Sequence, residues 1–514
     1  MTPLPQPLPP PDSFDQSSSM WVDEAIWGHR LYDEQLPWMV FLEFLNVFYH
    51  EAGKQRAFEE PNGLNTLKYK AAHRLYLRNI LFNNPHLTDI LVNYPSDSSR
   101  WEEWIKRMKS AQGIAHAQFS FLKNHFHSFE DFCDIVALVR STSLEVDSNK
   151  RWTSKFVFPY GKDCLFEDLD SNTTTNDRRF FGRTGEVLYL MLCRTSRKQD
   201  LLAALNKRLA NTDSTWDSII KCLQPNDDDQ VSGDRANAFL PYESHPAFDE
   251  LAEDWLSILR LNIPGFDAFP HLVNLAGLHL LKYQLSVSRQ VLGLNTPLSL
   301  ICEVVAHRKT LVREVSCDLY QENNLLPAQA VEAFLSKIET SPEWQQALTE
   351  NGAYERCRKI LRDRVRWGED QKDYEGPPDP HQLMAALRQS AMKRHRQHVA
   401  NIHRNYGREI GLVSRRGTVK LRYAPTDALL RTLLFANVEK RVELHQFLAK
   451  LYARYGLVFG DKEAEQVLAK GEFDKKAFQA NSRRLEQRLG SLGLLRRLSD
   501  GCAYVVNPHH LEAQ

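Results

Sequence analysis

Large apolar residues near the N-terminus recur at the spacing of one helix face. The clearest set follows an i, i+3, i+4, i+7 pattern: Trp38, Met39, Phe41, Leu42, Leu45 and Phe48. This pattern predicts an amphipathic helix, and it returns at residues 67–82, 101–108 and 129–139. Residues 1–20 are instead rich in Pro and Ser, a composition that buries too little apolar surface to fold. We therefore expect a disordered tail over 1–20 and a helical N-terminal domain over 21–223.

In one stretch of this domain, aromatic residues alternate with other residues as they do in a β-strand. Its aromatic residues are Trp152, Phe156, Phe158 and Tyr160. The alternation predicts a short β segment near residues 151–170, and the polar tract at 168–179 predicts a loop after it. The helical pattern resumes over residues 182–209.

Helical periodicity also dominates the middle of the chain. An acidic loop at 224–234 marks a candidate boundary, and residues 235–367 form a helical array after it. The predicted helices of this array cover residues 248–261, 269–292, 298–320, 328–338 and 343–366. Pro, Gly and acidic residues at 368–380 indicate a linker. The predicted fold class is therefore mainly α, with a multi-domain helical body and minor β content.

The last third of the chain differs in its pattern. Residues 381–424 combine a basic helix, which ends near Gly407, with two short strand-like pieces. Three helices are predicted beyond them, at residues 427–437, 444–455 and 475–489. Thr426 offers an N-cap signal for the first of these. Asp500 and Gly501 then separate two strand-like runs, which is a strong hairpin signal.

Three helices followed by a hairpin resemble a winged-helix domain, here over residues 425–510. The run NSRRLEQRLGSLGLLRRLSDGCAYVV is similar to the part of that fold in which the recognition helix leads into the wing. The resemblance implies that the third helix enters the major groove of DNA and that the wing meets phosphates or the minor groove. The residues expected at DNA are Asn481, Arg483, Arg484, Gln487 and Arg488 on the helix, and Arg496 and Arg497 at the base of the wing.

Winged helices also serve contacts between proteins, and this alternative stays open. Arg484 and Arg488 are four residues apart on one helix, so Glu486 or another acid can neutralise them. In that case the domain would dock a protein and not DNA.

The distribution of charge favours DNA. Lys and Arg number 65, as do Asp and Glu, so the net charge is zero. Residues 355–514 nevertheless carry +12, residues 1–354 carry −12, and residues 381–425 alone carry +9. A basic end of the chain indicates a polyanionic partner, with nucleic acid as the first candidate. The alternative is that the basic residues form a solvated surface, or a surface that docks on the acidic half of the same chain. Further residues expected at DNA are Lys393, Arg394, Arg396, Arg404, Arg415 and Arg416.

Few residues are arranged for catalysis. The sequence has no GxxxxGKS/T, HExxH or GxSxG motif. Asp163, Glu167, Asp168 and Asp170 lie close to two lysines, but their order lacks the spacing of a metal-dependent nuclease. The loop at 181–186 places Gly and Arg before a helix, which fits either a phosphate site or an ordinary helix N-cap. We expect no catalytic residue, no cofactor and no metal.

Composition and cysteine content indicate a globular protein of the cytoplasm. Of the 514 residues, 42% are hydrophobic and 10% aromatic, which excludes a disordered or collagen-like chain. The N-terminus lacks the basic and apolar regions of a secretory signal, and no apolar run is long enough to span a membrane. The eight cysteines lie at least 15 residues apart, which predicts reduced thiols.

Together these patterns predict a non-enzymatic, cytoplasmic protein that binds double-stranded DNA through its C-terminal third and makes no membrane contact. The acidic body is expected to bind other protein subunits. Such a chain would be an accessory or scaffold subunit of a multi-protein DNA-processing assembly, for example a prokaryotic anti-phage defence system. Two alternatives remain: a ligand-responsive transcription regulator, and a metal-dependent nuclease whose site the sequence does not reveal.

Overall fold

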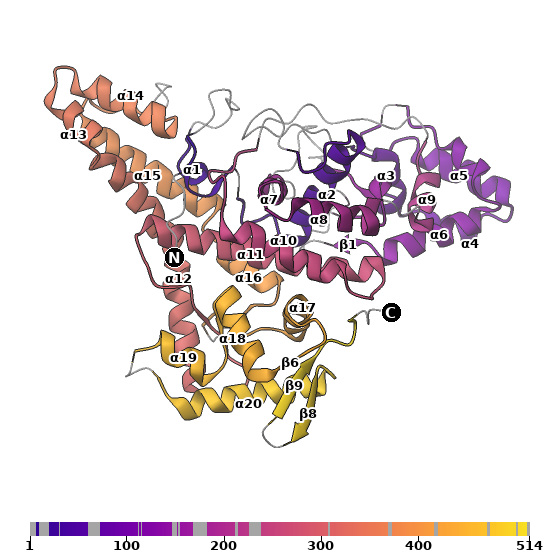
Figure 1. The fold of residues 1–514 in the computed structure, drawn as a ribbon. Helices are drawn as coiled ribbons and strands as arrows, with labels where there is room; N and C mark the ends of the chain where they lie inside the picture. The colour runs from indigo at the N-terminus through magenta and orange to yellow at the C-terminus, as the bar shows by residue number, and fades with distance from the viewer. Residues whose placement is uncertain are drawn as a thin grey trace.

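The structure, a computed structural model, has an elongated helical body and a smaller C-terminal unit beneath it (Figure 1). It describes residues 7–9, 20–29, 31–59, 72–111, 113–114, 116–145, 152, 155–167, 182–210, 214–225, 238–306, 309–367, 373–415, 420–469, 473–499 and 502–510. Most of the tail predicted at 1–20 and part of the linker predicted at 368–380 lie outside these residues. The described part is mainly helical with small sheets, which confirms the predicted fold class.

The first half of the body is built around α2 (Pro37–Gly53), whose apolar residues occupy more than one face and are buried. It packs against α7 (Thr184–Cys193), where a Cβ on Gly185 would lie 2.6 Å from the Val40 carbonyl oxygen. Any larger residue at Gly185 would therefore push the two helices apart. The surrounding helices are α1 (Asp23–Trp27), α3 (Leu75–Phe82), α4 (Leu87–Asn93), α5 (Asp97–Met108), α6 (Phe129–Ser141), α8 (Lys198–Leu205) and α9 (Thr215–Cys222).

A two-stranded antiparallel sheet lies in this half of the body. It pairs β1 (Leu144–Glu145) with β2 (Lys155–Phe156). β2 confirms the β segment predicted near residues 151–170.

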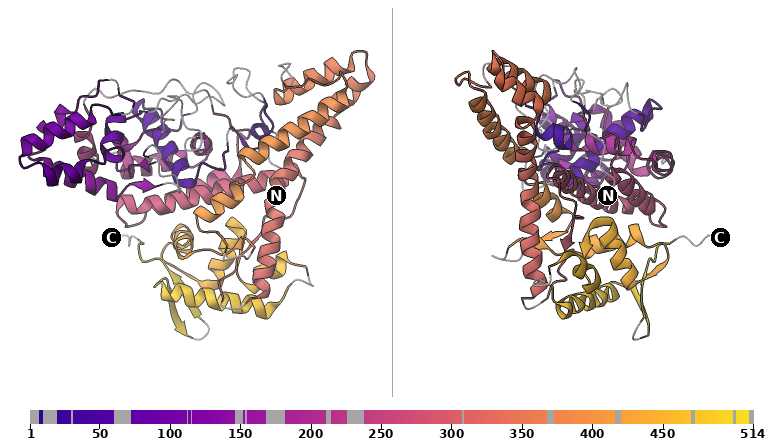
Figure 2. Two further views of the ribbon diagram at one scale, coloured as in Figure 1. Left: turned by 180° about the vertical axis from the view of Figure 1, so that it is seen from behind. Right: turned by 60° about the vertical axis from the view of Figure 1, so that its left-hand side comes forward.

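The second half of the body ends in a projecting arm. α10 (Pro246–Leu259) and α11 (Phe269–Val291) pack on the first half, and α12 (Leu311–Glu339) then crosses the molecule. Its 29 residues span about 44 Å at a rise of 1.5 Å per residue. One end of α12 lies against the C-terminal unit and the other end lies in the arm (Figure 2). The arm also contains α13 (Pro342–Thr349), α14 (Ala353–Val365) and α15 (Pro380–His398).

The separate helices predicted at 298–320 and 328–338 are wrong. Residues 300–301 form strand β3 (Leu300–Ile301), and α12 then continues unbroken through Pro327. Proline removes one hydrogen bond from a helix, but Pro327 is buried, and its apolar packing offsets that loss.

Three other predicted helices are interrupted. The one at 343–366 breaks at Gly352, which adopts a φ of +80° before α14 begins. The helix at 182–209 divides into α7 and α8, and the basic helix that ends near Gly407 divides into α15 and α16 (Ile402–Glu409).

The C-terminal unit contains the predicted three helices and hairpin. The helices are α17 (Asp427–Asn437), α18 (Leu444–Tyr455) and α20 (Lys475–Ser491). β6 (Arg441–Glu443), β8 (Leu495–Ser499) and β9 (Cys502–Val506) form an antiparallel sheet in the order β6-β9-β8. The Thr426 side chain caps α17, as predicted. The loop predicted before α20 contains β7 (Leu457–Val458) and α19 (Asp461–Val467).

This unit shares its core with the body. β7 pairs in parallel with β3, so that Leu457 lies opposite Leu300. Gly456 allows the approach, because its φ is +73° and a Cβ there would lie 2.3 Å from the Leu298 carbonyl oxygen. A single apolar core therefore reaches from Met20 in the body to Val505 in the sheet.

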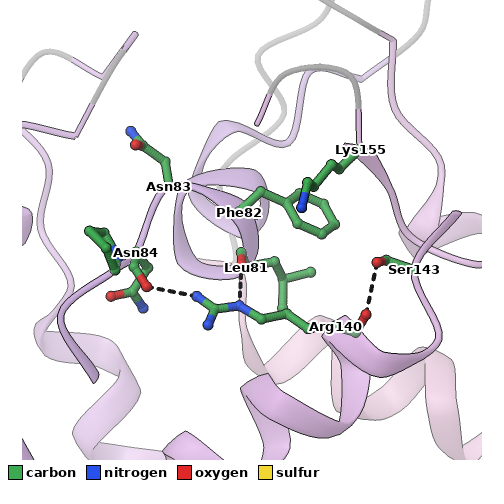
Figure 3. Close-up of a pocket in the computed structure, with 8 residues that line it drawn as sticks. Leu81, Phe82, Asn83, Asn84, Arg140, Ser143 and Lys155 are labelled. Carbon is green, nitrogen blue, oxygen red and sulfur yellow. Dashed lines mark hydrogen bonds between the residues drawn. The ribbon is translucent and has the colours of Figure 1, made fainter. Parts of the chain in front are cut away.

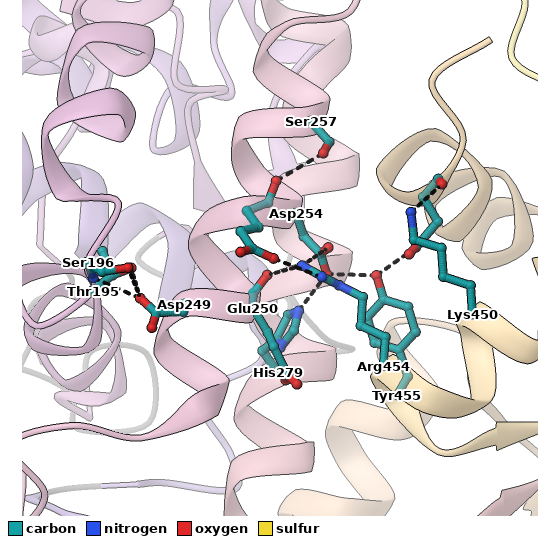
Figure 4. A network of polar contacts seen from close by, with 12 residues as sticks. Thr195, Ser196, Asp249, Glu250, Asp254, Ser257, His279, Lys450, Arg454 and Tyr455 are labelled. Carbon is teal, nitrogen blue, oxygen red and sulfur yellow. Dashed lines mark hydrogen bonds and ion pairs between the residues drawn. The ribbon is translucent and has the colours of Figure 1, made fainter.

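A buried polar network joins the same two parts (Figure 4). Asp254 of α10 accepts a 2.7 Å hydrogen bond from the Tyr455 hydroxyl of α18, and its carboxylate lies 2.7 Å from both His279 Nε2 and Arg454 Nη2. Asp254 and His279 are each 1% exposed. Because a buried carboxylate is stable only with such partners, the network holds α18 to α10 and α11.

Two further features bear on the sequence-based expectations. No helix within the described ranges has the length and apolar character needed to cross a membrane. All eight cysteines are free, and Cys502 is the exposed one.

The β4–β5 hairpin leads into the C-terminal unit. β4 (Val413–Ser414) and β5 (Arg422–Tyr423) pair antiparallel, which confirms the two strand-like pieces predicted after the basic helix.

Candidate nucleic-acid interface

α20 presents different residues on its two sides. Its buried side chains are Phe478, Asn481, Leu485 and Leu489, which recur at helical spacing and face the rest of the protein. The opposite stripe is exposed and consists of Lys476, Ala480, Arg483 and Gln487. The candidate interface is therefore this exposed stripe and not the whole helix.

Asn481 is not part of the exposed stripe, which corrects its prediction as a DNA contact. It is fully buried, and its Oδ1 accepts a 2.8 Å hydrogen bond from the Val304 amide. Its Nδ2 donates to the carbonyl oxygens of Cys302 at 2.9 Å and Phe459 at 3.0 Å. Asn481 thus ties α20 to the segment that follows β3.

Arg484 and Arg488 also turn toward the protein. The Arg484 Nε donates to the Val304 carbonyl oxygen at 3.2 Å. Arg488 pairs with Asp427 at the start of α17 and donates to the Pro425 carbonyl oxygen at 3.3 Å. Both are half-buried, so their guanidinium groups hold α20 in place and are not freely presented to a ligand.

The remaining predicted residues of this unit are exposed. Arg483 and Gln487 face solvent on α20, and Arg483 makes no ion pair with any described residue. Lys476, which was not predicted, is exposed on the same stripe and also makes no ion pair with any described residue. On the hairpin, Arg496 and Arg497 are exposed, and Arg497 Nε lies 3.4 Å from Glu486 Oε1. Glu486 therefore neutralises Arg497, not Arg484 or Arg488.

The basic residues upstream lie at two places. Lys393 and Arg396 are exposed on α15 in the arm, whereas Arg394 pairs with Glu24 and donates to the Met20 carbonyl oxygen. Arg394 is thus held by residues of α1 and the segment before it, and its guanidinium is not freely presented to a ligand. Arg404 on α16 and Arg415 after β4 are exposed.

The predicted Arg416 lies outside the described residues. Exposed cations that the sequence did not single out include Lys476 on α20 and, further away, Lys309, Arg408 and Lys420. The basic run HRK at 307–309 is a signal that draws attention to Lys309.

In the described part of the loop predicted at 181–186, residues 182–186, side chains of the protein bind the backbone amides, which disfavours the phosphate alternative. Gln35 Oε1 accepts hydrogen bonds from the amides of Gly182 at 2.9 Å and Thr184 at 3.0 Å. Glu43 Oε2 accepts one from the Gly185 amide at 2.8 Å. Three backbone donors at the start of α7 are therefore already bound within the protein.

Among the described residues, the acidic side chains considered as ligands of a nuclease metal do not form one cluster. Asp163 forms ion pairs of 3.2 Å with both Arg74 and Lys221, and Asp168 and Asp170 lie outside the description. Across the described part of the chain, no three His, Cys, Asp or Glu side chains are grouped so that they could hold a metal ion.

A cavity of about 460 Å³ lies between α3 and α6 in the body (Figure 3). Arg140 spans it and donates to the carbonyl oxygens of Leu81 and, at 2.8 Å, Asn84. Burial lowers the pKa of Arg140. Its guanidinium satisfies the free carbonyls at the end of α3, which is a structural role.

Comparison with family models, curated proteins and solved structures finds no match for this chain. Its function is therefore argued from the geometry of the exposed stripe and its surroundings.

Proposed function

We propose that this protein is a non-enzymatic DNA-binding subunit, and that α20 and the β8–β9 hairpin contact duplex DNA. The supporting observation is the exposed stripe of α20, where Lys476, Arg483 and Gln487 face solvent at helical spacing. Arg496 is also exposed, on the hairpin that follows the helix. Between residues 475 and 497 the chain has seven Lys or Arg and one acid. A helix with this outward face matches the chemistry of the major groove, since Arg and Gln donate to base edges and Lys neutralises phosphates.

The rest of the chain suits an accessory or scaffold role in this proposal. Residues 1–354 carry a net charge of −12, so the body repels DNA while the C-terminal unit attracts it. The body therefore remains available for protein partners.

The test is the salt dependence of DNA binding by the full chain. Fluorescence anisotropy with a labelled 30-base-pair duplex should show a log K that falls linearly with log salt. The double variant Lys476→Ala, Arg483→Ala should flatten this slope by about two units if both side chains meet phosphates. If Arg483 reads a base, its loss should instead cost about 1–3 kcal/mol on the preferred sequence.

The matched control is Lys106→Ala, Lys123→Ala, which removes two exposed lysines from the far part of the body. It should bind like the parent. A parent that fails to bind duplex DNA at low salt would refute the proposal, as would a folded Lys476, Arg483 double variant that binds normally.

A further inference from the structure

The cavity between α3 and α6 has the size of a small-molecule site (Figure 3). Its volume of about 460 Å³ lies within the range of about 300–1,000 Å³ that such sites occupy. Polar side chains reach its wall from separate elements: Asn83 after α3, Arg140 of α6 and Lys155 of β2. Among the described residues that line the cavity, two are cations and none is an acid. The wall of the cavity therefore carries positive charge.

The protein compensates the charge of Arg140 only in part. Its Nε and Nη2 donate to neutral groups, the carbonyl oxygens of Leu81, Ile80 and Asn84. The macrodipole of α3 adds about half a negative charge at this helix end. Burial lowers the pKa of Arg140, and the Cys133 thiol opposes this shift. Because a partly buried cation is costly without an anionic partner, an anion in the cavity would stabilise the guanidinium.

Arg140 also keeps a donor for such an anion. Its Nη1 donates to no described residue, and Arg140 makes no ion pair with any of them. Lys155 lines the same cavity, but Glu145 lies opposite it in the β1–β2 register. The ladder thus pairs one cation with one acid, and the excess charge at the cavity is that of Arg140. One excess positive charge fits a monoanion.

Another part of the wall is apolar. The half-buried ring of Phe82 lines the cavity, together with Leu81 and Pro85. An aromatic ring offers a large apolar surface to a ligand, whereas a guanidinium is complementary to a carboxylate. A carboxylate that is attached to an apolar group matches both parts of the wall.

We propose that this cavity binds a small organic monocarboxylate, with the carboxylate at Arg140 and the apolar part of the ligand against Phe82. Arg140 then has two roles, since it binds the free carbonyls of α3 and also holds the ligand. The site lies in the body, on elements that contribute nothing to the α20 stripe or the β8–β9 hairpin. It therefore adds a ligand site that does not depend on DNA binding.

The experiment titrates the full chain with benzoate, and with benzamide as its neutral counterpart, and detects binding by saturation-transfer difference NMR. Benzoate should bind at least about tenfold more tightly than benzamide, because hydrogen bonds to a charged partner are the stronger ones. For the same reason, Arg140→Gln should weaken benzoate binding by at least about tenfold.

The matched control is Arg100→Gln. Arg100 likewise binds the end of a helix, since it donates to the carbonyl oxygens of Tyr94 at 2.8 Å and Leu91 at 3.1 Å after and within α4. It is not among the residues that line the cavity. Arg100→Gln should therefore bind benzoate like the parent.

A second variant separates loss of the ligand from a folding defect, because Arg140 also holds the end of α3. Ser143→Phe keeps the Arg140 guanidinium and adds a ring at the wall of the cavity, so it should exclude benzoate. Circular dichroism establishes that each variant is folded.

Several results would overturn the proposal. These are a parent that does not bind benzoate, equal binding of benzoate and benzamide, and a folded Arg140→Gln or Ser143→Phe variant that binds benzoate normally. Inorganic phosphate that binds the parent more tightly than benzoate would overturn the assignment of a carboxylate.

Discussion

The Tyr455 hydroxyl of α18 donates a hydrogen bond of 2.7 Å to the buried carboxylate of Asp254 on α10. The two residues are 201 positions apart in sequence. The C-terminal unit is therefore anchored to the body by a polar contact in the protein interior, where an unpaired partner is costly.

Breaking this anchor should destabilise the whole protein. Asp254→Ala leaves buried His279 without its carboxylate and leaves Arg454 with Glu253 alone, and we expect a loss of about 3–5 kcal/mol in the free energy of unfolding. Tyr455→Phe removes two hydrogen bonds, the one donated to Asp254 and the one accepted from Asn437 Nδ2, and should cost about 1–3 kcal/mol. Urea denaturation measures both, and a Tyr455→Phe value larger than that of Asp254→Ala would contradict the central position of the carboxylate.

Asn481 should matter for stability and not for base recognition. Asn481→Ala removes the partner of the Val304 amide and of two carbonyl oxygens, at a cost of about 1–3 kcal/mol. Gln487→Ala, on the exposed side of the same helix, should change stability by less than about 0.5 kcal/mol. Thermal melts of the two variants provide the comparison, and equal melting temperatures would argue against the structural role of Asn481.

Substitution of two arginines of α20, Arg483 and Arg488, should have different effects on stability and on DNA binding. Arg488→Ala removes the contacts to Asp427 and Pro425 and should lower the melting temperature. Arg483→Ala should leave the melt unchanged and weaken DNA binding, because its side chain is exposed. Paired melts and anisotropy titrations distinguish them, and the assignment of faces fails if Arg483→Ala lowers the melting temperature while Arg488→Ala does not.

The last third of the chain should not fold well without the body. A fragment over residues 381–514 lacks β3, α12 and the segment between them, and therefore the strand partner of β7, the Val304 acceptor of Arg484 and two of the three backbone partners of Asn481. A fragment over residues 298–514 retains them and should show more cooperative melting and slower amide hydrogen exchange. A cooperative melt of the shorter fragment at the same temperature would show that the shared core is dispensable.

Stability should fall in acid because of buried histidines. Burial lowers the pKa of both His245 and His403 to about 3 and that of His271 to about 4, whereas unfolded histidine titrates near about 6.5. The unfolded chain therefore binds more protons between these values. The stability that these three neutral, buried histidines allow is complete above about pH 6.5. It is lost as the pH falls from there toward their pKa values in the folded protein.

A His403 variant tests this pH dependence. Each such histidine contributes up to about 1.4 kcal/mol per pH unit. Urea denaturation from pH 7.5 to 5 should show a shallower decline for His403→Gln than for the parent. Parallel curves would mean that His403 titrates alike in both states.

Local sequence signals determined much of the secondary structure. Apolar periodicity marked α2, α10, α11 and α20, because a helix buries one stripe of side chains wherever it packs. The same signals failed at Pro327, where tertiary packing outweighs the local preference of proline.

Only the tertiary structure decided which residues of the candidate interface are accessible. Arg483 and Arg484 are adjacent in sequence and identical in type, yet α20 points one to solvent and the other to the Val304 carbonyl. A helix turns by about 100° per residue, so the sequence predicts that the two side chains point in different directions. It does not predict which of these directions is covered by the rest of the protein. The body element that covers one of them is contributed by residues 180 positions earlier. Such long-range pairings depend on the whole fold, and periodicity within α20 contains no information about them.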